Sequence, residues 1–124
     1  MKYVCLVHFD AGEVFGSVLD RAGQVQLGID SLAYDEELKE SGNLIHAQAL
    51  QSPESAVLVR VRDGRTSTTD GPFIETKEQL AGFILIEARD LNDAIRIAAG
   101  IPLAKLGTIE VRPIYQIPVH ESVQ

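Results

Sequence analysis

The sequence predicts a single α+β domain in which two helices cover one face of an antiparallel four-stranded sheet, with a β-hairpin added to that plan. Two observations lead to this fold class. The chain has 124 residues, 45% of them hydrophobic, which is enough for one domain with its own core. Its periodic segments follow one another as strand, helix, strand, hairpin, strand, helix and strand, and two of the strands are apolar on both faces.

The chain begins with a strand that is expected to be central in the sheet. Residues 3–9 are apolar almost without interruption, as in a strand that is covered on both faces. Asp10, Gly12 and Gly16 then break the periodicity. Residues 10–23 are therefore expected to form a loop with at most a short helical turn, placed where it could lie over the mouth of a pocket.

A helix is predicted over residues 25–41. Leu27, Tyr34 and Leu38 recur at helical spacing with Ser31 on the same stripe, and this stripe is expected to face the sheet. The charged side chains of the helix are expected to point away from the sheet: Asp35, Glu36, Glu37 and Lys39. Gly42 provides the left-handed residue that ends the helix.

The middle of the chain predicts a strand and a hairpin. Strict alternation in residues 44–50 divides the side chains between a partly polar face, with Leu44, His46, Gln48 and Leu50, and an apolar face, with Ile45, Ala47 and Ala49. Residues 56–62 alternate as a strand does, and Asp63 and Gly64 lead to a threonine-rich partner strand over residues 65–69, so a hairpin is predicted.

A second apolar strand is predicted over residues 81–87. Before it, Thr76 and Gln79 have the spacing of a capping box, so residues 76–80 are expected to form one helical turn. Gly82 is expected to have a structural role, because a residue without a side chain allows a neighbouring strand to approach closely.

The last elements are a helix and an edge strand. Asp90 is a good N-cap for a helix that is expected to turn Leu91, Ala94, Ile95 and Ala98 inward, and Gly100 with Pro102 ends it. Residues 108–117 form the last strand. Pro113 cannot donate a ladder hydrogen bond, which predicts an edge position for this strand.

Two apolar strands flanked by two half-polar strands correspond to a ferredoxin-like sheet of order 4-1-3-2, with the first and third core strands in the centre. Helices can cover only one face of such a sheet. The two central strands are nevertheless apolar on both faces, so the uncovered face predicts a homodimer.

Charge and cysteine content argue against several classes of function. The formal net charge of −7 and the scattered Lys and Arg residues argue against binding to nucleic acid. The apolar runs are far shorter than the ~20 residues that span a bilayer, and no signal-peptide pattern opens the chain, so a cytoplasmic protein without membrane contact is expected. A lone Cys5 fits a reducing compartment and a packing role. No metal-ligand spacing and no nucleotide motif is present, so neither a metal nor a cofactor is expected.

Seven polar residues are candidates for a site. His8, His46 and Asp70 are candidates for acid or base catalysis, and Ser31, Tyr34, Glu75 and Glu78 are candidates for ligand binding. Each has a structural alternative that stays open. An Asp before Gly71 and Pro72 can accept backbone hydrogen bonds from residues 73–76 and hold the turn, a sheet His can be hydrogen-bonded within the core, and glutamates can be solvated. His120 lies in the tail and is expected to take no part.

Residues 70–78 read Asp-Gly-Pro-Phe-Ile-Glu-Thr-Lys-Glu. This segment resembles the D-G-P-F-x-E-T-K-E signature of the DGPF group within the YCII-related proteins, and a looser likeness extends over about residues 1–115. The resemblance implies a ferredoxin-like domain, here residues 1–117 followed by a tail at 118–124, that pairs into a dimeric α+β barrel.

The resemblance also bears on function. Some YCII-related proteins carry a His on the first helix paired with an Asp as an acid–base dyad, and the corresponding position here holds Ser31, which cannot shuttle protons near neutral pH without an activating base. Two functions are implied. One is binding of a small organic molecule between the first helix, the sheet and the DGPF loop, with cofactor-independent lyase-like or isomerase-like chemistry. The other is a non-catalytic ligand-binding or regulatory accessory, for example of an alternative sigma factor.

Overall fold

The computed structural model of the protein describes residues 1–118. Along these residues the elements are β1 (Lys2–Phe9), α1 (Ala11–Glu13), the π-helix η1 (Val14–Val18), α2 (Arg21–Glu40), β2 (Leu44–Ala49), the short helix η2 (Pro53–Ser55), β3 (Val57–Arg62), β4 (Arg65–Asp70), β5 (Gln79–Glu87), α3 (Leu91–Ala99), the short helix η3 (Pro102–Lys105) and β6 (Thr108–Pro113). Residue 118 is the only part of the predicted tail that is described, and His120 lies outside the described residues.

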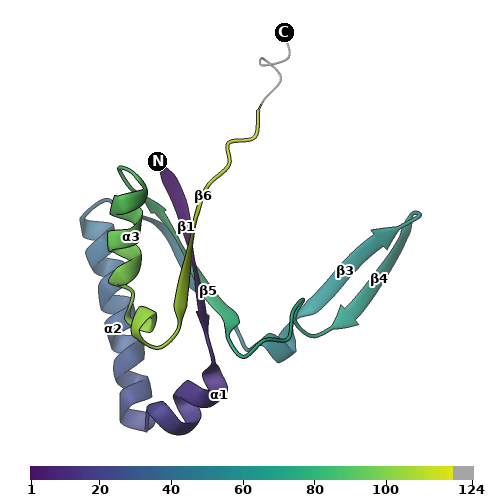
Figure 1. Ribbon diagram of the computed structural model, residues 1–124, viewed down its shortest axis with the longest axis horizontal. Coiled ribbons are helices and arrows are strands. Elements are labelled where there is room, and N and C mark those ends of the chain that lie inside the picture. Colours follow the sequence, from purple (N-terminus) through teal and green to yellow (C-terminus); the bar gives the residue numbers. More distant parts are fainter. Residues whose placement is uncertain (119–124) are drawn as a thin grey trace.

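Four strands form an antiparallel sheet of order β2-β5-β1-β6. The two apolar strands, β1 and β5, occupy the centre, and β6 with Pro113 is an edge strand, as predicted. Helices α2 and α3 lie together on one face of this sheet (Figure 1). The α+β class and the ferredoxin-like arrangement are therefore confirmed.

The core lies between the helices and the sheet. Tyr3 and Cys5 of β1, Ile86 of β5 and Ile97 of α3 are fully buried there. Burial raises the pKa of the Cys5 thiol to about 11, because the thiolate would have to form in an apolar environment. Cys5 is thus an inert packing residue, as predicted.

Two aspartates extend helical structure into the segment that was predicted to be a loop. Asp10 Oδ1 accepts a hydrogen bond of 3.1 Å from the Glu13 N–H at the start of α1, and Asp20 Oδ1 accepts one of 2.8 Å from the Gly23 N–H at the start of α2. Residues 11–18 are helical and α2 begins at Arg21, so the predicted loop over residues 10–23 is wrong. At the other end of α2, Gly42 has φ +80°, as its predicted left-handed role requires.

A β-bulge changes the face assignment of β2. Its pairing with β5 shifts between Leu44 and His46, so Ile45 is the extra residue. After the bulge, Ala47 pairs with Ile84, which faces the helices, whereas His46 pairs with Leu85 on the uncovered face. Leu44 therefore shares the helix side with Ala47, and the predicted grouping of Leu44 with His46 is wrong.

Two local predictions near the last helix also need correction. In α3, Leu91 and Ile95 are half exposed, and Asp93 and Ile97 are buried together with Ala94 and Ala98. Residues 76–80 form no helical turn. The Gln79 side chain instead donates hydrogen bonds to backbone carbonyls of the loop that precedes β5.

The hairpin β3–β4 forms a separate two-stranded sheet that extends away from the domain on the side opposite to the helices (Figure 1). Its turn has positive φ at both central residues, +51° at Asp63 and +74° at Gly64, which suits the right-handed twist of the two strands. The hairpin was predicted; its separation from the main sheet was not.

Candidate functional site

A cavity of about 810 Å³ lies between α2 and the sheet. Its floor is formed by small residues of β2 and β5, namely Ala47, Ala49, Ala81 and Gly82. Apolar side chains make up most of its walls: Val7, Phe9, Phe15, Leu27, Leu32, Leu50, Ile84, Ile101 and Leu103. A mostly apolar cavity of this volume falls within the range of sites for small organic molecules.

Ser31 and Asp35 of α2 supply polar groups to this cavity. They are four residues apart and so lie on one face of the helix, one turn from each other. Ser31 Oγ donates a hydrogen bond of 2.7 Å to the Leu27 carbonyl oxygen, as a helical serine commonly does. The Ser31 oxygen remains able to accept a hydrogen bond from a bound molecule.

Asp35 is half buried. Desolvation raises the pKa of its carboxyl above the ordinary value, and the negative charge of neighbouring Glu36 raises it further. Its prediction as an outward-facing residue is wrong. The spacing of four residues from Ser31 was the signal that could have placed it on the cavity side.

Gly82 allows β2 and β5 to meet under the cavity. A Cβ at this position would lie 2.8 Å from the Gln48 carbonyl oxygen and 3.3 Å from Ala49 Cα. Only glycine fits this contact without a shift of the backbone, so the predicted close approach is confirmed.

Tyr34 lines the same cavity, but its hydroxyl is used within the fold. It donates a hydrogen bond of 2.6 Å to the Ile97 carbonyl oxygen. Burial is the largest cause of the raised pKa of Tyr34. A neutral hydroxyl that donates to the backbone is a structural group, so Tyr34 offers mainly its ring to a ligand.

The glutamates of the DGPF loop lie next to two neighbouring cavities. Glu75 lines one of about 480 Å³ together with Phe9 and Lys77, and Glu78 lines one of about 590 Å³ together with His8. Both glutamates are exposed. All three cavities share Leu50, and the predicted ligand residues are divided among them without meeting at one point.

The two histidines lie on the uncovered face of the sheet. His8 is half buried there, and its Nε2 is 3.1 Å from Glu110 Oε1 on β6. His46 Nε2 is 3.3 Å from Gln48 Nε2, and its ring packs beside that of Phe83, with 6.0 Å between the ring centroids. Neither imidazole lines the cavity that contains Ser31.

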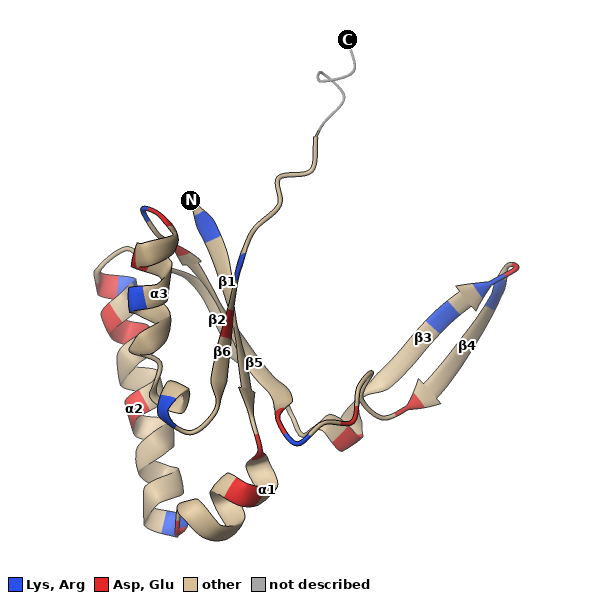
Figure 2. Cartoon of the chain, viewed as in Figure 1, with Lys and Arg blue, Asp and Glu red and all other residues tan. Residues whose placement is uncertain are grey.

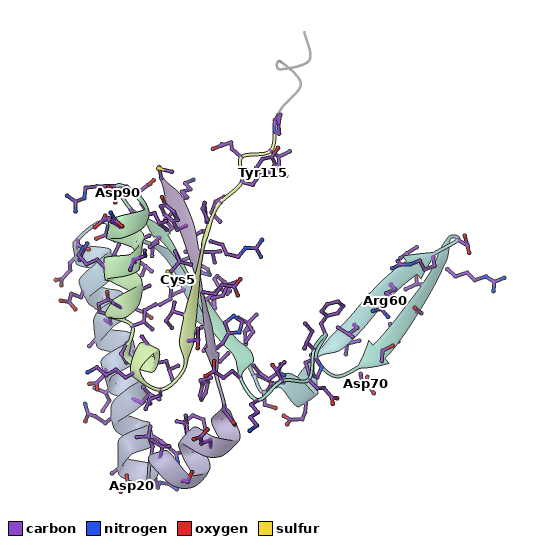
Figure 3. All side chains as sticks on the ribbon, in the orientation of Figure 1. Cys5, Asp20, Arg60, Asp70, Asp90 and Tyr115 are labelled. Atoms are coloured by element: carbon purple, nitrogen blue, oxygen red, sulfur yellow. The ribbon has the colours of Figure 1, made fainter. Side chains whose placement is uncertain are left out.

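Asp70 ends β4 on the far side of the hairpin base, away from that cavity (Figure 3). It is exposed, and within residues 1–118 its carboxylate accepts no hydrogen bond, so the expected bonds from residues 73–76 are not formed. Gln79 organises the loop instead, because its Nε2 donates to the carbonyl oxygens of Ile74 at 2.7 Å and Thr76 at 3.0 Å. Gly71 has φ +102°, a conformation that favours glycine.

Two further observations concern the described part of the chain. No group of three His, Cys, Asp or Glu side chains in residues 1–118 is arranged to hold a metal ion. Among the same residues, no helix has the length and apolar character that crossing a membrane requires.

Three comparisons relate this chain to known proteins. The sequence model of the YCII-related domain matches residues 1–118. An uncharacterised protein of Rhizobium meliloti (strain 1021) is 38% identical over 87 residues, which cover 68% of this chain and 70% of that protein. The structure of the 5-chloro-2-hydroxyhydroquinone dehydrochlorinase of Burkholderia phenoliruptrix AC1100, in complex with 2,5-dihydroxybenzoquinone, superposes with a TM-score of 0.55 over 93% of this chain and 94% of that one. At 14% identity, this last similarity is one of fold.

Proposed function

We propose that this chain, which belongs to the family of YCII-related domains, binds a small organic molecule in the cavity between α2 and the sheet. In this proposal the carboxylate of Asp35 exchanges a proton with the bound molecule. The observation that carries this proposal is the position of Asp35. It is a half-buried carboxylate with a raised pKa, placed beside Ser31 in an otherwise mostly apolar cavity of ligand size.

Asp35 suits the role of a general base that needs no cofactor. A carboxylate with a raised pKa is a stronger proton acceptor than an ordinary aspartate, and an apolar cavity strengthens its interaction with a bound O–H or C–H acid. Ser31 would orient the same ligand through a hydrogen bond. His8, His46 and Asp70 do not line this cavity, so we assign the proton transfer to Asp35.

The expected ligand is a hydroxylated ring compound. The cavity walls include the rings of Phe9 and Phe15, which suit a flat apolar ligand, and Asp35 with Ser31 suits hydroxyl groups on it. The dehydrochlorinase of similar fold, in complex with 2,5-dihydroxybenzoquinone, supports the same class of compound.

The variant Asp35→Asn tests this proposal, with Glu40→Gln as control, because Glu40 is an exposed carboxylate on the same helix. Affinity and turnover of hydroxylated ring compounds should fall in Asp35→Asn and stay unchanged in Glu40→Gln. In the wild type both should decline as the pH falls through the raised pKa of Asp35, because protonation removes the base. Equal affinity and turnover in all three proteins would contradict the proposal.

A stability measurement shows whether Asp35→Asn remains folded. Because the pKa of Asp35 is raised in the folded state, the ionised carboxylate lowers stability at pH values above that pKa. Asp35→Asn should therefore melt at the same or a higher temperature than the wild type at pH 7. Loss of function without loss of stability is the expected result.

Binding without turnover is a second candidate function. It is favoured by Ser31, which occupies the position where some relatives carry a catalytic His. Ligand affinity that depends on Asp35, with no conversion of any ring compound, would support this candidate. A role as a regulatory accessory would then follow from ligand binding alone.

We also propose that the protein is a homodimer, paired through the uncovered face of the sheet. That face presents four apolar side chains from the central strands: Val4, Leu6, Phe83 and Leu85. All four are only half buried in the single chain. A stable pair would bury on the order of 1,200–2,000 Å² in total.

The lone buried thiol of Cys5 fits a reducing compartment, and the cytoplasm is the location that we propose.

A further inference from the structure

The hairpin β3–β4, residues 57–70, forms an arm with two different faces. Val57, Val59 and Val61 lie on one face and are 56%, 62% and 57% exposed. Their cross-strand partners on that face are Asp70, Thr68 and Thr66. Arg60 and Arg62 lie on the opposite face.

The arm is paired only within itself, as a sheet of two strands. An isolated two-stranded hairpin is at best marginally stable in water, and a row of exposed valines is an apolar surface of the kind that marks an interaction site. Phe73 and Ile74, which follow the arm in the chain, are exposed as well. The arm is therefore expected to be covered by a partner.

The direction of the arm indicates which partner covers it. The arm leaves the lower end of the sheet and extends on the side opposite to α2 and α3 (Figure 1). This is the side of the uncovered sheet face, which carries Leu6 and Phe83. A second sheet packed on that face would lie between the arm and the first sheet.

Charge also favours a second copy of the chain. The arm carries Arg60, Arg62 and Arg65 against two aspartates, so its net charge is +1, whereas the whole chain carries −7 and the rest of it therefore −8. Figure 2 shows basic residues along β3 and near the outer end of the arm, with acidic residues at its tip and at its base, and residues of both signs on the body of the domain. At long range this arm is attracted to the acidic body of an identical molecule rather than repelled by it. The three arginines lie on the face opposite to the valines, so the contact itself would be made by the apolar face.

We propose that the arm of each protomer clasps a second copy of this chain, with the valine face packed against that copy. The proposal rests on the homodimer proposed above and adds a second contact to it. Each body is then held by the uncovered sheet face of its partner and by the partner's arm.

Hydrogen exchange of the full chain tests the clasp, at a concentration where light scattering shows dimers. Amides of β3 and β4 should exchange at least about tenfold more slowly in the wild-type dimer than in the variant Phe83→Arg, which places a charge on the uncovered sheet face and should yield monomers. Equal exchange in dimer and monomer would overturn the clasp and leave the arm to a different protein partner.

A pair of variants separates the clasp from the dimer. Val59→Asp places a charge on the valine face, and Thr69→Asp, the control, places the same charge on the opposite face of the arm. Val59→Asp should weaken dimerisation at least about tenfold and Thr69→Asp by less than about twofold, with the circular dichroism of both unchanged. A dimer that Val59→Asp does not weaken contradicts the clasp alone. A wild type that is monomeric at tens of micromolar contradicts the proposed dimer and the clasp together, without bearing on the ligand cavity.

Discussion

The hydroxyl of Tyr34 donates a hydrogen bond of 2.6 Å to the carbonyl oxygen of Ile97, and this bond joins the middle of α2 to the last turn of α3. The ring lies directly over Gly100, where a Cβ would collide with the Tyr34 hydroxyl oxygen and ring. Tyr34 thus links the two helices at the edge of the cavity between α2 and the sheet.

Tyr34→Phe should lower the free energy of unfolding by about 1 kcal/mol, because it removes this hydrogen bond and leaves the ring in place. Tyr115→Phe is the control, since Tyr115 is 75% exposed. Denaturant unfolding of the two variants measures the difference. Equal stability of both variants would show that the bond to Ile97 contributes nothing measurable.

Gly82→Val should lower stability by roughly 1–3 kcal/mol, because the new side chain would meet the backbone of β2 at Gln48. Gly28→Ala makes a matched comparison. Gly28 lies within α2, and a Cβ there meets nothing within 4 Å, so alanine should raise stability by about 0.5–1 kcal/mol. Thermal melts of both variants check the opposite signs, and an unchanged melting temperature in Gly82→Val would refute the close approach.

Asp93 should make stability fall in acid. The carboxylate is buried and accepts hydrogen bonds from the Arg89 backbone N–H and from the side chains of Arg96 and Arg89, which together hold its pKa well below the ordinary range. Because the pKa of Asp93 is lower in the folded state than in the unfolded state, the ionised carboxylate stabilises the protein at pH values above the unfolded-state pKa of about 3.9. This contribution is lost as the pH falls toward the folded-state pKa.

Asp93→Asn should therefore melt at a lower temperature than the wild type at pH 7, and the two melting temperatures should converge between about pH 4 and pH 2. Melting curves across this range provide the measurement, with Glu40→Gln as an exposed carboxylate control. A gap between wild type and Asp93→Asn that does not change with pH would contradict the role of the charge.

Gln79 should matter more than Asp70 for the order of the DGPF loop. Gln79→Ala removes the donor to Ile74 and Thr76, so amides of residues 71–78 should exchange faster and the free energy of unfolding should fall by about 1 kcal/mol. Asp70→Ala should change neither quantity, because the exposed Asp70 carboxylate accepts no bond within residues 1–118. The reverse ranking would restore Asp70 as the organiser of the loop.

The order of the elements could be predicted because the sequence carries local signals for it. Strand alternation, the Asp90 cap, the Gly42 terminus and the Asp63-Gly64 turn each depend on a few neighbouring residues. The caps at Asp10 and Asp20 are local signals too. The glycines near them break the apolar periodicity, and for that reason the helices that begin at these caps were predicted to be a loop.

Other features depend on tertiary contacts that no short pattern reveals. The extra residue Ile45 reverses the faces of β2, and its position is set by pairing with β5. In α3 the buried apolar residues are Ala94, Ile97 and Ala98, because the position of the helix over the sheet decides which apolar residues are covered. For the same reason Asp35 was missed, since a charged residue is assigned to the surface by default and its place beside Ser31 depends on the cavity.

The most direct test of the proposed ligand site is an amide NMR titration of the full chain with 2,5-dihydroxybenzoquinone, the compound in complex with the dehydrochlorinase of similar fold. Binding in the proposed cavity should shift the amides of Ser31, Asp35, Ala47 and Gly82 in a saturable way and leave those of Arg60 and Arg112 unchanged. The same titration of Asp35→Asn should show weaker binding at the same amides. Saturable shifts confined to residues outside the cavity between α2 and the sheet would contradict the account.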